Sequence, residues 1–505
     1  DRDKRGVWLN FLMFFMTGIA IVIYLNQPPY QVRERDYAYA GSFYFFSVWI
    51  GLGLAALCSW LGGRMKSEKG SASLNAVLFL ACLGVSVLMA AQNWDDHDRS
   101  GRRTAVEMGR NYLNSVGPNG ILVTHGDNDT FPLWYAQEVE NCRTDVRICN
   151  TSLLGTDWHI DQMKWAVNES APLDLSVGPE QYLYGTNEMI PIVDLREEVM
   201  SISDVMTLFR HPQVKAPMSS GRKVDYIASR RISVPVNREN VIKSGILDSK
   251  YESQIPDSII LNISKDKDYI TKPELFMLDL LSNYQWDRPI CLLSMGGDLN
   301  IGIKEYFEYN GYSFQLIPIK NKTTSTQAGF VDSDELYRKM TQVYSWDALA
   351  EDDYFIDYQN EYTFLGVLSQ RNLFTMCADV FIREGQTDRA AEMLSKCEQV
   401  MRRYPLETIP LGFSGNDYMV VDMINQYYAL GLADKARQTA RQLGDELLVT
   451  AAFYLEFYDW GRNEFELAGN YIYLLSDALK NGGDAELGKE LTDKFVDLVN
   501  SATGS

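Results

Sequence analysis

The chain has 505 residues and a formal net charge of −20, but the charge is unevenly divided along it. Residues 1–91 carry a net charge of +3, and the remaining residues carry −23. Such an acidic portion excludes nucleic acid as a partner, because a phosphate backbone requires a basic protein surface. The seven cysteines show neither a C-x-x-C pattern nor zinc-finger spacing, which argues against a structural zinc site.

Three runs without a charged residue lie near the N-terminal end, at residues 7–25, 43–61 and 74–91. A helix needs about 20 apolar residues to cross the hydrocarbon layer, so each run predicts a transmembrane helix. Buried helices of a soluble core are the alternative, but three successive runs joined by short polar loops argue against it. A cleaved signal peptide is an alternative for the first run, but no small-residue cleavage site follows Leu25. The first residue is Asp1 rather than Met, so we expect the chain to continue a longer polypeptide.

The basic residues around these runs predict their orientation. Basic residues precede the first run and lie between the second and third: Arg2, Lys4, Arg5, Arg64, Lys66 and Lys69. Cytoplasmic loops carry the excess of basic residues, so the N-terminal end and the loop at 62–73 should be cytoplasmic. Residues 92–505 should then be periplasmic, with the chain in a bacterial inner (cytoplasmic) membrane.

Two short polar segments next to these runs are candidate sites at the membrane face. Arg33 and Arg35, in the first outer loop, could bind a phosphate through their guanidinium groups. Mutual salt bridges with Glu34 and Asp36 explain the same residues equally well.

The second segment directly follows the third run and is rich in charge. Its candidate residues are Asp95, Asp96, His97, Asp98 and Arg99. Such a cluster could hold a divalent cation or a lipid-linked phosphate, or could act as acid and base. A solvated, salt-bridged start of a helix at the membrane interface is the structural alternative.

Strands alternate with helices from residue 104 onward, which predicts a parallel α/β sheet within a domain spanning residues 92–330. We expect helices at 104–116, 132–140, 157–167 and 273–283, and strands at 121–124, 146–149, 259–263, 290–293 and 314–317. Residues 175–255 carry no clear pattern. Whether Cys142 and Cys149 form a disulfide is not determined by the sequence.

The loop after the first of these strands predicts a ligand crevice, because open α/β sheets bind ligands beyond the carboxyl ends of their strands. The loop after the second strand should lie at the same edge of the sheet. The candidate residues come from the first loop and from the helix after the second strand: His125, Asp127, Asn128, Asp129, Thr130, Trp158 and His159. The alternative is helix capping by Asp129 or Thr130 ahead of Pro132. Capping needs only one of these side chains.

Residues 331–505 are predicted to be helical. Two segments share a turn of the same kind, at residues 385–390 and 431–436, and a looser third copy lies at residues 482–483. Glycine in the turn and small residues at helix crossings favour stacked hairpins of the tetratricopeptide (TPR-like) type. The spacing is irregular, so a plain helical bundle remains the alternative.

Three stretches together resemble one known family: residues 33–37, residues 93–99, and residues 126–135 continuing to 143–146. They resemble the Bacteroidota membrane proteins catalogued as domain of unknown function 2723 (DUF2723), which are grouped with glycosyltransferase family 117 and with protein O-mannosyltransferases. The resemblance implies a GT-C-type glycosyltransferase of which this chain is the C-terminal portion. The presumed catalytic carboxylate of such enzymes lies in an earlier outer loop, so no catalytic residue can be assigned here.

The resemblance implies that a mannose-like sugar passes from a polyprenyl-phosphate carrier to Ser or Thr of an exported acceptor protein. Arg33 and Arg35 would then contact the carrier phosphate. A membrane-anchored periplasmic scaffold that binds a protein without catalysis is the alternative function.

Overall fold

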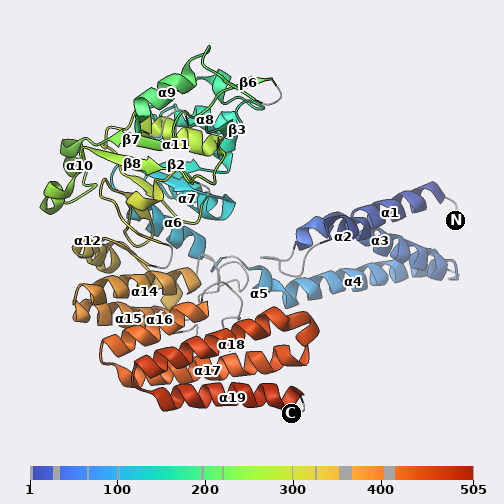
Figure 1. The fold of residues 1–505 in the computed structure, drawn as a ribbon. Helices are drawn as coiled ribbons and strands as arrows, with labels where there is room; N and C mark the ends of the chain where they lie inside the picture. Colours follow the sequence, from blue (N-terminus) through green and yellow to red (C-terminus); the bar gives the residue numbers. More distant parts are fainter. Residues whose placement is uncertain are drawn as a thin grey trace. The chain divides into compact units, whose positions relative to one another are not determined.

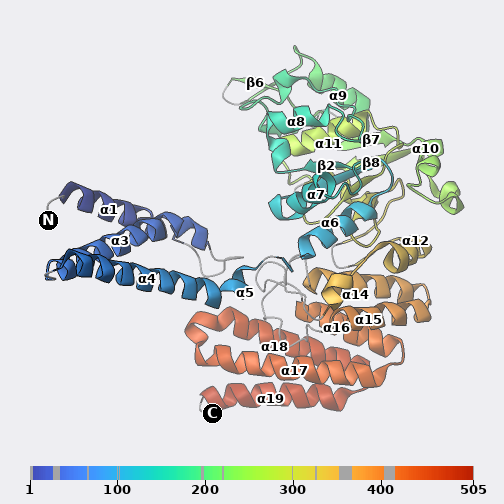
Figure 2. The same ribbon diagram turned by 180° about the vertical axis from the view of Figure 1, so that it is seen from behind.

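The computed structural model describes residues 4–26, 35–64, 67–98, 100–101, 103–194, 198–218, 221–297, 299–324, 327–351, 367–402 and 416–503. The chain forms two compact units, one with the residues up to Arg102 and the other beginning at Arg103. Figures 1 and 2 show the elements of both units from opposite sides.

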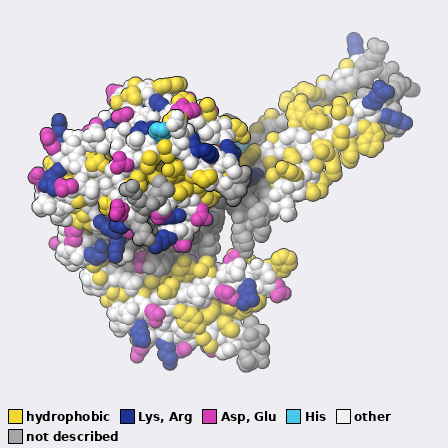
Figure 3. Space-filling view, turned by 45° about the horizontal axis from the view of Figure 1, so that its top comes forward, with side chains coloured by type: hydrophobic (Ala, Val, Ile, Leu, Met, Phe, Trp, Pro, Cys, Tyr) yellow, Lys and Arg dark blue, Asp and Glu magenta, His cyan; other side chains and the backbone are white. Residues whose placement is uncertain are grey.

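The first unit consists of apolar helices. They are α1 (Lys4–Met16), α2 (Ile19–Leu25), η1 (Asp36–Tyr39), α3 (Ala40–Gly62), α4 (Glu68–Gln92) and α5 (Trp94–His97). Three spans are long and apolar enough to cross a membrane, at Lys4–Leu25, Asp36–Gly62 and Lys69–Gln92. Their large hydrophobic side chains are mostly exposed, as the yellow surface of these helices shows in Figure 3. The expectation of three membrane-length helices is confirmed.

Polar side chains form hydrogen bonds between α1 and α3, whose contact is otherwise apolar. Asn10 Nδ2 donates to the Phe45 carbonyl at 3.2 Å, and Ser42 Oγ donates to the Phe14 carbonyl at 3.1 Å. A Cβ at Gly18 would lie 2.5 Å from Ser42 Oγ, so only glycine permits this close approach. Small residues and interhelical hydrogen bonds are what holds helices together in lipid, where apolar burial provides no driving force.

The second unit is built around a five-stranded sheet of order β11-β12-β10-β1-β2. Its strands are β1 (Ile121–Thr124), β2 (Arg147–Asn150), β10 (Ile290–Leu292), β11 (Phe307–Tyr309) and β12 (Phe314–Leu316). β1 pairs in parallel with β2 and β10, whereas β12 is antiparallel to both β10 and β11. The sheet is therefore mixed rather than wholly parallel. The turn between β11 and β12 contains Gly311 with φ +100°, which lets the chain reverse directly.

Helices cover both faces of this sheet. They are α6 (Thr104–Ser115), α7 (Asp127–Glu138), η2 (Leu153–Gly155), α8 (Asp157–Met163) and α11 (Lys272–Ser282). Leu122 of β1 packs in a cluster with Leu113 of α6 and Leu133 of α7. Its neighbours Ile121 and Val123 belong to the larger core that includes α8 and α11. Because side chains alternate along a strand, this division shows a sheet buried on both faces.

Residues 175–255, which the sequence left unassigned, form short elements outside the central sheet. They include η3 (Pro179–Gln181), β3 (Met189–Pro191), β4 (Met200–Ser201), α9 (Ile202–Arg210), β5 (Ala216–Pro217), β6 (Lys223–Val224), β7 (Arg231–Pro235), α10 (Arg238–Lys243) and η4 (Ser249–Gln254). β7 pairs with β8 (Ser258–Asn262), and β3 pairs with β9 (Tyr269–Thr271). The strand predicted at 259–263 thus exists but belongs to a second sheet.

The C-terminal part of the second unit is helical. After α12 (Ser333–Arg338), the π-helical turn η6 (Lys339–Val343) and α13 (Asp347–Ala350) come three helical hairpins. They are α14 (Val367–Arg383) with α15 (Thr387–Val400), α16 (Asn416–Ala429) with α17 (Ala433–Glu456), and α18 (Tyr458–Asn481) with α19 (Ala485–Thr503). First helices pack on first helices and α17 packs on α19, so the hairpins are stacked, as Figure 2 shows.

The three hairpins turn in the same way. Each turn contains a glycine with positive φ: Gly385 at +73°, Gly431 at +74° and Gly483 at +92°. The N–H after each glycine donates to a carbonyl five residues earlier at 2.8 Å in all three turns. This is the Schellman pattern that ends a helix on a left-handed residue. The three equal turns support stacked hairpins, while their assignment as TPR-like repeats stays a prediction.

Candidate functional site

The two segments predicted at the membrane face are only partly described by the structure. Arg33, Arg99 and the side chains of Asp95 and Asp96 lie outside the described residues. Arg35 is exposed directly before η1.

The described residues of the charged segment make local contacts. His97 Nδ1 lies 2.9 Å from the Asn93 carbonyl, and Asp98 Oδ1 accepts the Ser100 N–H at 2.8 Å. Within the described ranges, no group of His, Cys, Asp and Glu is arranged to hold a metal ion. The phosphate and cation roles of both segments stay predictions.

Asp129 caps helix α7, but from inside the helix rather than ahead of it. The helix begins at Asp127, five residues before the predicted start, so Pro132 lies in its interior. The Asp129 carboxylate accepts the N–H groups of His125 and Gly126, both at 2.8 Å. Both oxygens are therefore used in holding the loop after β1 against the first turn of α7.

Thr130 is a buried structural residue. Its Oγ1 lies 2.6 Å from Thr124 Oγ1 and accepts Asn150 Nδ2 at 2.8 Å. Asn150 Oδ1 accepts the Leu153 N–H at 3.0 Å, so these polar groups tie together the ends of β1 and β2.

His125 lies where the loops after three parallel strands meet. Its imidazole is 3.2 Å from Thr151 Oγ1, beyond β2, and 3.2 Å from the Ser294 carbonyl, beyond β10. A Cβ at Gly297 would lie only 1.6 Å from the ring, so this position must be glycine. The predicted meeting of loops at one sheet edge is present, and His125 holds it together.

His159 is buried beneath this edge. Its Nε2 accepts the Asn150 N–H at 3.3 Å, and its Nδ1 faces Gln162 Oε1 at 3.4 Å. Burial lowers the pKa of His159, which keeps the ring neutral. Trp158 beside it is exposed, with its ring edge-to-face to His159 at 5.3 Å.

Asp127 and Asn128 are the two residues of this loop that are left for a ligand. Both are exposed, and neither side chain forms a hydrogen bond or ion pair with the part of the chain that the structure describes. Trp158, early in the helix after β2, is also exposed. Their binding role stays a prediction.

A cavity of about 620 Å³ lies at the opposite end of the sheet, where β1 and β2 begin. The segment before β1, the loop after α10, strand β11 and helix α12 line it. The lining residues that matter for its chemistry are Arg143, Asp248, Glu308, Asp332, Glu335, Arg338 and Lys339. The cavity therefore lies between the α/β core and α12, the first helix of the helical part.

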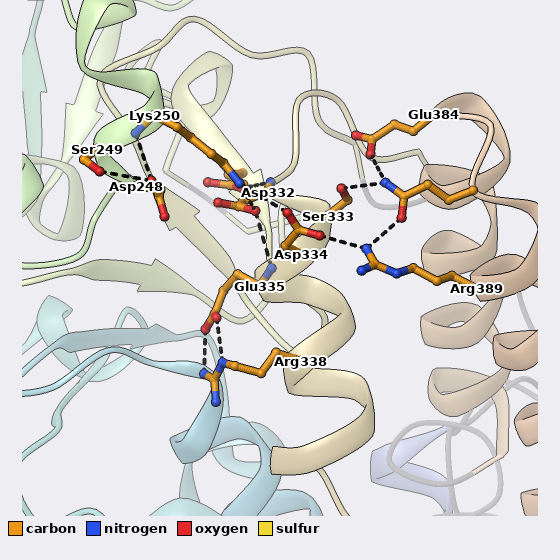
Figure 4. Close-up of polar contacts among 12 residues, drawn as sticks. Asp248, Ser249, Lys250, Asp332, Ser333, Asp334, Glu335, Arg338, Glu384 and Arg389 are labelled. Carbon is orange, nitrogen blue, oxygen red and sulfur yellow. Dashed lines mark hydrogen bonds and ion pairs between the residues drawn. The ribbon is translucent and has the colours of Figure 1, made fainter.

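Ion pairs at the rim of this cavity connect three segments. Lys250 Nζ is 2.9 Å from Asp332 Oδ1 and 3.6 Å from Asp334 Oδ2. Asp334 in turn contacts Arg389 of α15 at 2.9 Å. Figure 4 shows this chain of contacts, together with the separate pair of Glu335 and Arg338. The rim charges thus neutralise one another.

The inner wall of the cavity holds two buried charged groups with altered proton affinity. Glu308 on β11 accepts the Asp332 N–H through Oε1, and burial raises the pKa of Glu308 to about 7. Lys339 donates to the Ser115 carbonyl at 3.0 Å, and burial lowers its pKa. Neither forms an ion pair within the described residues. Buried groups with shifted pKa values in a cavity are typical of ligand or catalytic sites.

Sequence reasoning missed this cavity because its residues come from segments far apart in the chain. One local signal was present: Glu308 is a charged residue inside a strand, between Phe307 and Tyr309. A second signal is visible only in the structure. Lys339 begins the π-helical turn η6, a rare geometry that is frequent at functional sites.

A comparison with protein families identifies similarity in this region. A family model described as TMEM260-associated domain 2 matches residues 105–335. The similarity is to a TMEM260-associated domain. The matched residues include the sheet and the cavity wall up to Glu335. No curated protein and no solved structure matches the chain. With its three membrane-length helices, the chain is a candidate membrane protein carrying a region similar to a TMEM260-associated domain.

Proposed function

We propose that the chain is part of a GT-C-type membrane glycosyltransferase, which passes a mannose-like sugar from a polyprenyl-phosphate carrier to Ser or Thr of exported proteins. The observation that carries this proposal is the TMEM260-associated match on a chain with three membrane-length helices. The match supports a glycosyltransferase-like membrane protein, and the resemblance to the DUF2723 family supports the sugar carrier.

The two units have different tasks in this proposal. The helices keep the chain at the bilayer that contains the lipid carrier, with Arg33 and Arg35 at the carrier phosphate. The second unit lies on the periplasmic side and positions the acceptor protein. Its cavity of about 620 Å³ has the size of a small-molecule site and offers Glu308 and Lys339 as hydrogen-bonding groups for an acceptor.

Intact mass spectrometry of exported proteins tests the proposal in cells that encode the full-length protein. Disrupting the gene should remove hexose-sized mass increments from exported proteins, and restoring it should return them. Glu308→Gln should lower the increments, because the altered group lines the cavity. Glu252→Gln changes the charge equally at an exposed position of η4 and should have no effect. Unchanged masses after gene disruption would contradict sugar transfer.

The second candidate function is a membrane-anchored scaffold that binds a protein without catalysis. The stacked hairpins of residues 367–503 favour it, since such stacks present long binding surfaces. Unchanged exported-protein masses together with specific peptide binding would favour this function.

A further inference from the structure

A polar groove of about 360 Å³ lies between α14 and α16, the first helices of two neighbouring hairpins. Both helices contribute one face to it, with residues spaced three or four apart. The lining residues used below are Thr375, Met376, Asp379, Ile382, Asp422 and Gln426. The groove shares no lining residue with the cavity that contains Glu308.

Gln426 in the groove wall has an unsatisfied hydrogen-bond acceptor. The residue is only 9% exposed, and its Nε2 donates to the Thr375 carbonyl at 2.9 Å. A carbonyl only accepts, so this contact fixes which end of the amide faces Thr375. Gln426 Oε1 then has no hydrogen-bond partner among the residues that the structure describes. Leaving a buried acceptor unpaired is unfavourable, and a ligand N–H would satisfy it.

Two carboxylates in the same groove have no cationic partner from a neighbouring element in the described part of the chain. Within the described ranges, Asp379 pairs only with Arg383, one turn along its own helix, at 3.0 Å. Asp422 is half-buried and forms no hydrogen bond or ion pair with the described parts of the chain. Burial, and then the Asp379 charge, raise the pKa of Asp422 to about 6. A bound cation would relieve the repulsion between the two carboxylates.

We infer that this groove binds an extended segment of another polypeptide that carries an arginine or lysine. An N–H group of the segment donates to Gln426 Oε1, and the cationic side chain lies between Asp379 and Asp422. The apolar side chains of Met376 and Ile382 contact the aliphatic stem of that residue, as long cationic side chains prefer. A second copy of this chain, with a net charge of −20, is a poor occupant. The inference does not depend on sugar transfer.

Fluorescence anisotropy on the purified chain in detergent tests it. The probe is a short fluorescein-labelled peptide of serine, threonine and glycine with a central arginine, and the comparison peptide has glutamate in its place. The arginine peptide should bind and the glutamate peptide should not. Asp422→Asn should weaken binding about tenfold, because one charge-assisted contact is lost. Asp497→Asn removes the same charge from an exposed position on α19 and should leave binding unchanged.

A thermal unfolding scan of each variant separates binding from folding. Asp422→Asn should keep or raise the melting temperature, since it removes an unpaired half-buried carboxylate. Asp379→Asn provides a second variant, whose effect on binding should be in the same direction. Equal binding of the arginine and glutamate peptides, or unchanged binding by both groove variants, would overturn the inference.

Discussion

Asp127 and Asp129 lie two positions apart in the same helical turn but have different surroundings. Asp129 accepts two backbone N–H groups, whereas the Asp127 side chain is exposed and forms no hydrogen bond or ion pair with the described residues. Asp129→Ala should therefore lower the free energy of unfolding by about 1–2 kcal/mol, the usual cost of a lost helix cap. Asp127→Asn should change it by less than about 0.5 kcal/mol, as expected for a surface position. Urea unfolding of both variants measures the difference.

The functional outcome separates the two interpretations of this loop. If Asp127 contacts a ligand, Asp127→Asn should reduce activity of the full-length protein while its stability stays the same. A loss of stability in Asp127→Asn equal to that in Asp129→Ala would show that both residues are structural.

Glu308 should make stability depend on pH. Its pKa is about 7 in the folded protein, against an ordinary value of 4.5. Between these values the folded state keeps a proton that the unfolded state has released, so stability falls as pH rises through this window. Glu308→Gln should remove that fall and raise the free energy of unfolding above pH 7 by about 1–3 kcal/mol. The glutamine can still accept the Asp332 N–H.

Urea unfolding of wild type and Glu308→Gln, below and above this pH window, measures the effect. The two proteins should have similar stability at the lower pH and should diverge at the higher pH. An identical pH dependence of the two proteins would show that Glu308 ionises normally.

At the scale of whole elements, Arg143 caps the C-terminal end of α6. Its guanidinium donates to the carbonyls of Leu113, Val116 and Gly117 at 3.0, 2.8 and 3.1 Å, and it also pairs with Asp145. Although Arg143 belongs to the segments that carry the family resemblance, these contacts give it a structural role. They hold α6 against the loop before β2.

Removing this guanidinium should be costly. Arg143→Ala leaves several carbonyls without their donor and should lower the free energy of unfolding by about 3 kcal/mol. Arg110→Ala, which breaks a pair between α6 and Glu140 in the turn after α7, should cost less than about 1 kcal/mol. Equal effects of the two variants in thermal or urea unfolding would contradict the capping role.

The sequence pattern predicted the strands that are short apolar runs, such as β1, β2 and β10. It also predicted the helices α6 and α11. It left residues 175–255 unassigned, because the strands there belong to small separate sheets and their pairing is decided by distant partners. It also placed the start of α7 too late, because proline usually lies in the first turn of a helix, whereas Pro132 lies in the interior of α7.

The candidate sites also divide into those that the sequence predicted and those that it did not. The loops beyond β1 and β2 were predicted to meet because parallel strands end at one edge. The cavity around Glu308 and the groove around Asp422 were not predicted. Each is formed by packing between elements that are far apart or separated by whole helices in the chain, and no local spacing indicates such contacts.

At the scale of the whole molecule, the two units of the structure also differ in net charge. The N-terminal helices have exposed apolar side chains and a basic balance, whereas the second unit is strongly acidic. The expected orientation depends only on the basic residues before the first span and between the second and third, because cytoplasmic loops carry the excess of lysine and arginine.

The central claim is that this large unit works on the periplasmic side of the membrane, where exported proteins can be reached. Fusion of a reporter that is active only in the cytoplasm tests it most directly, at two positions of the otherwise complete protein. A fusion after Ser505 should be inactive, and a fusion at Ser67, in the loop before α4, should be active. The opposite pattern would place the cavity and the groove in the cytoplasm and would contradict both candidate functions.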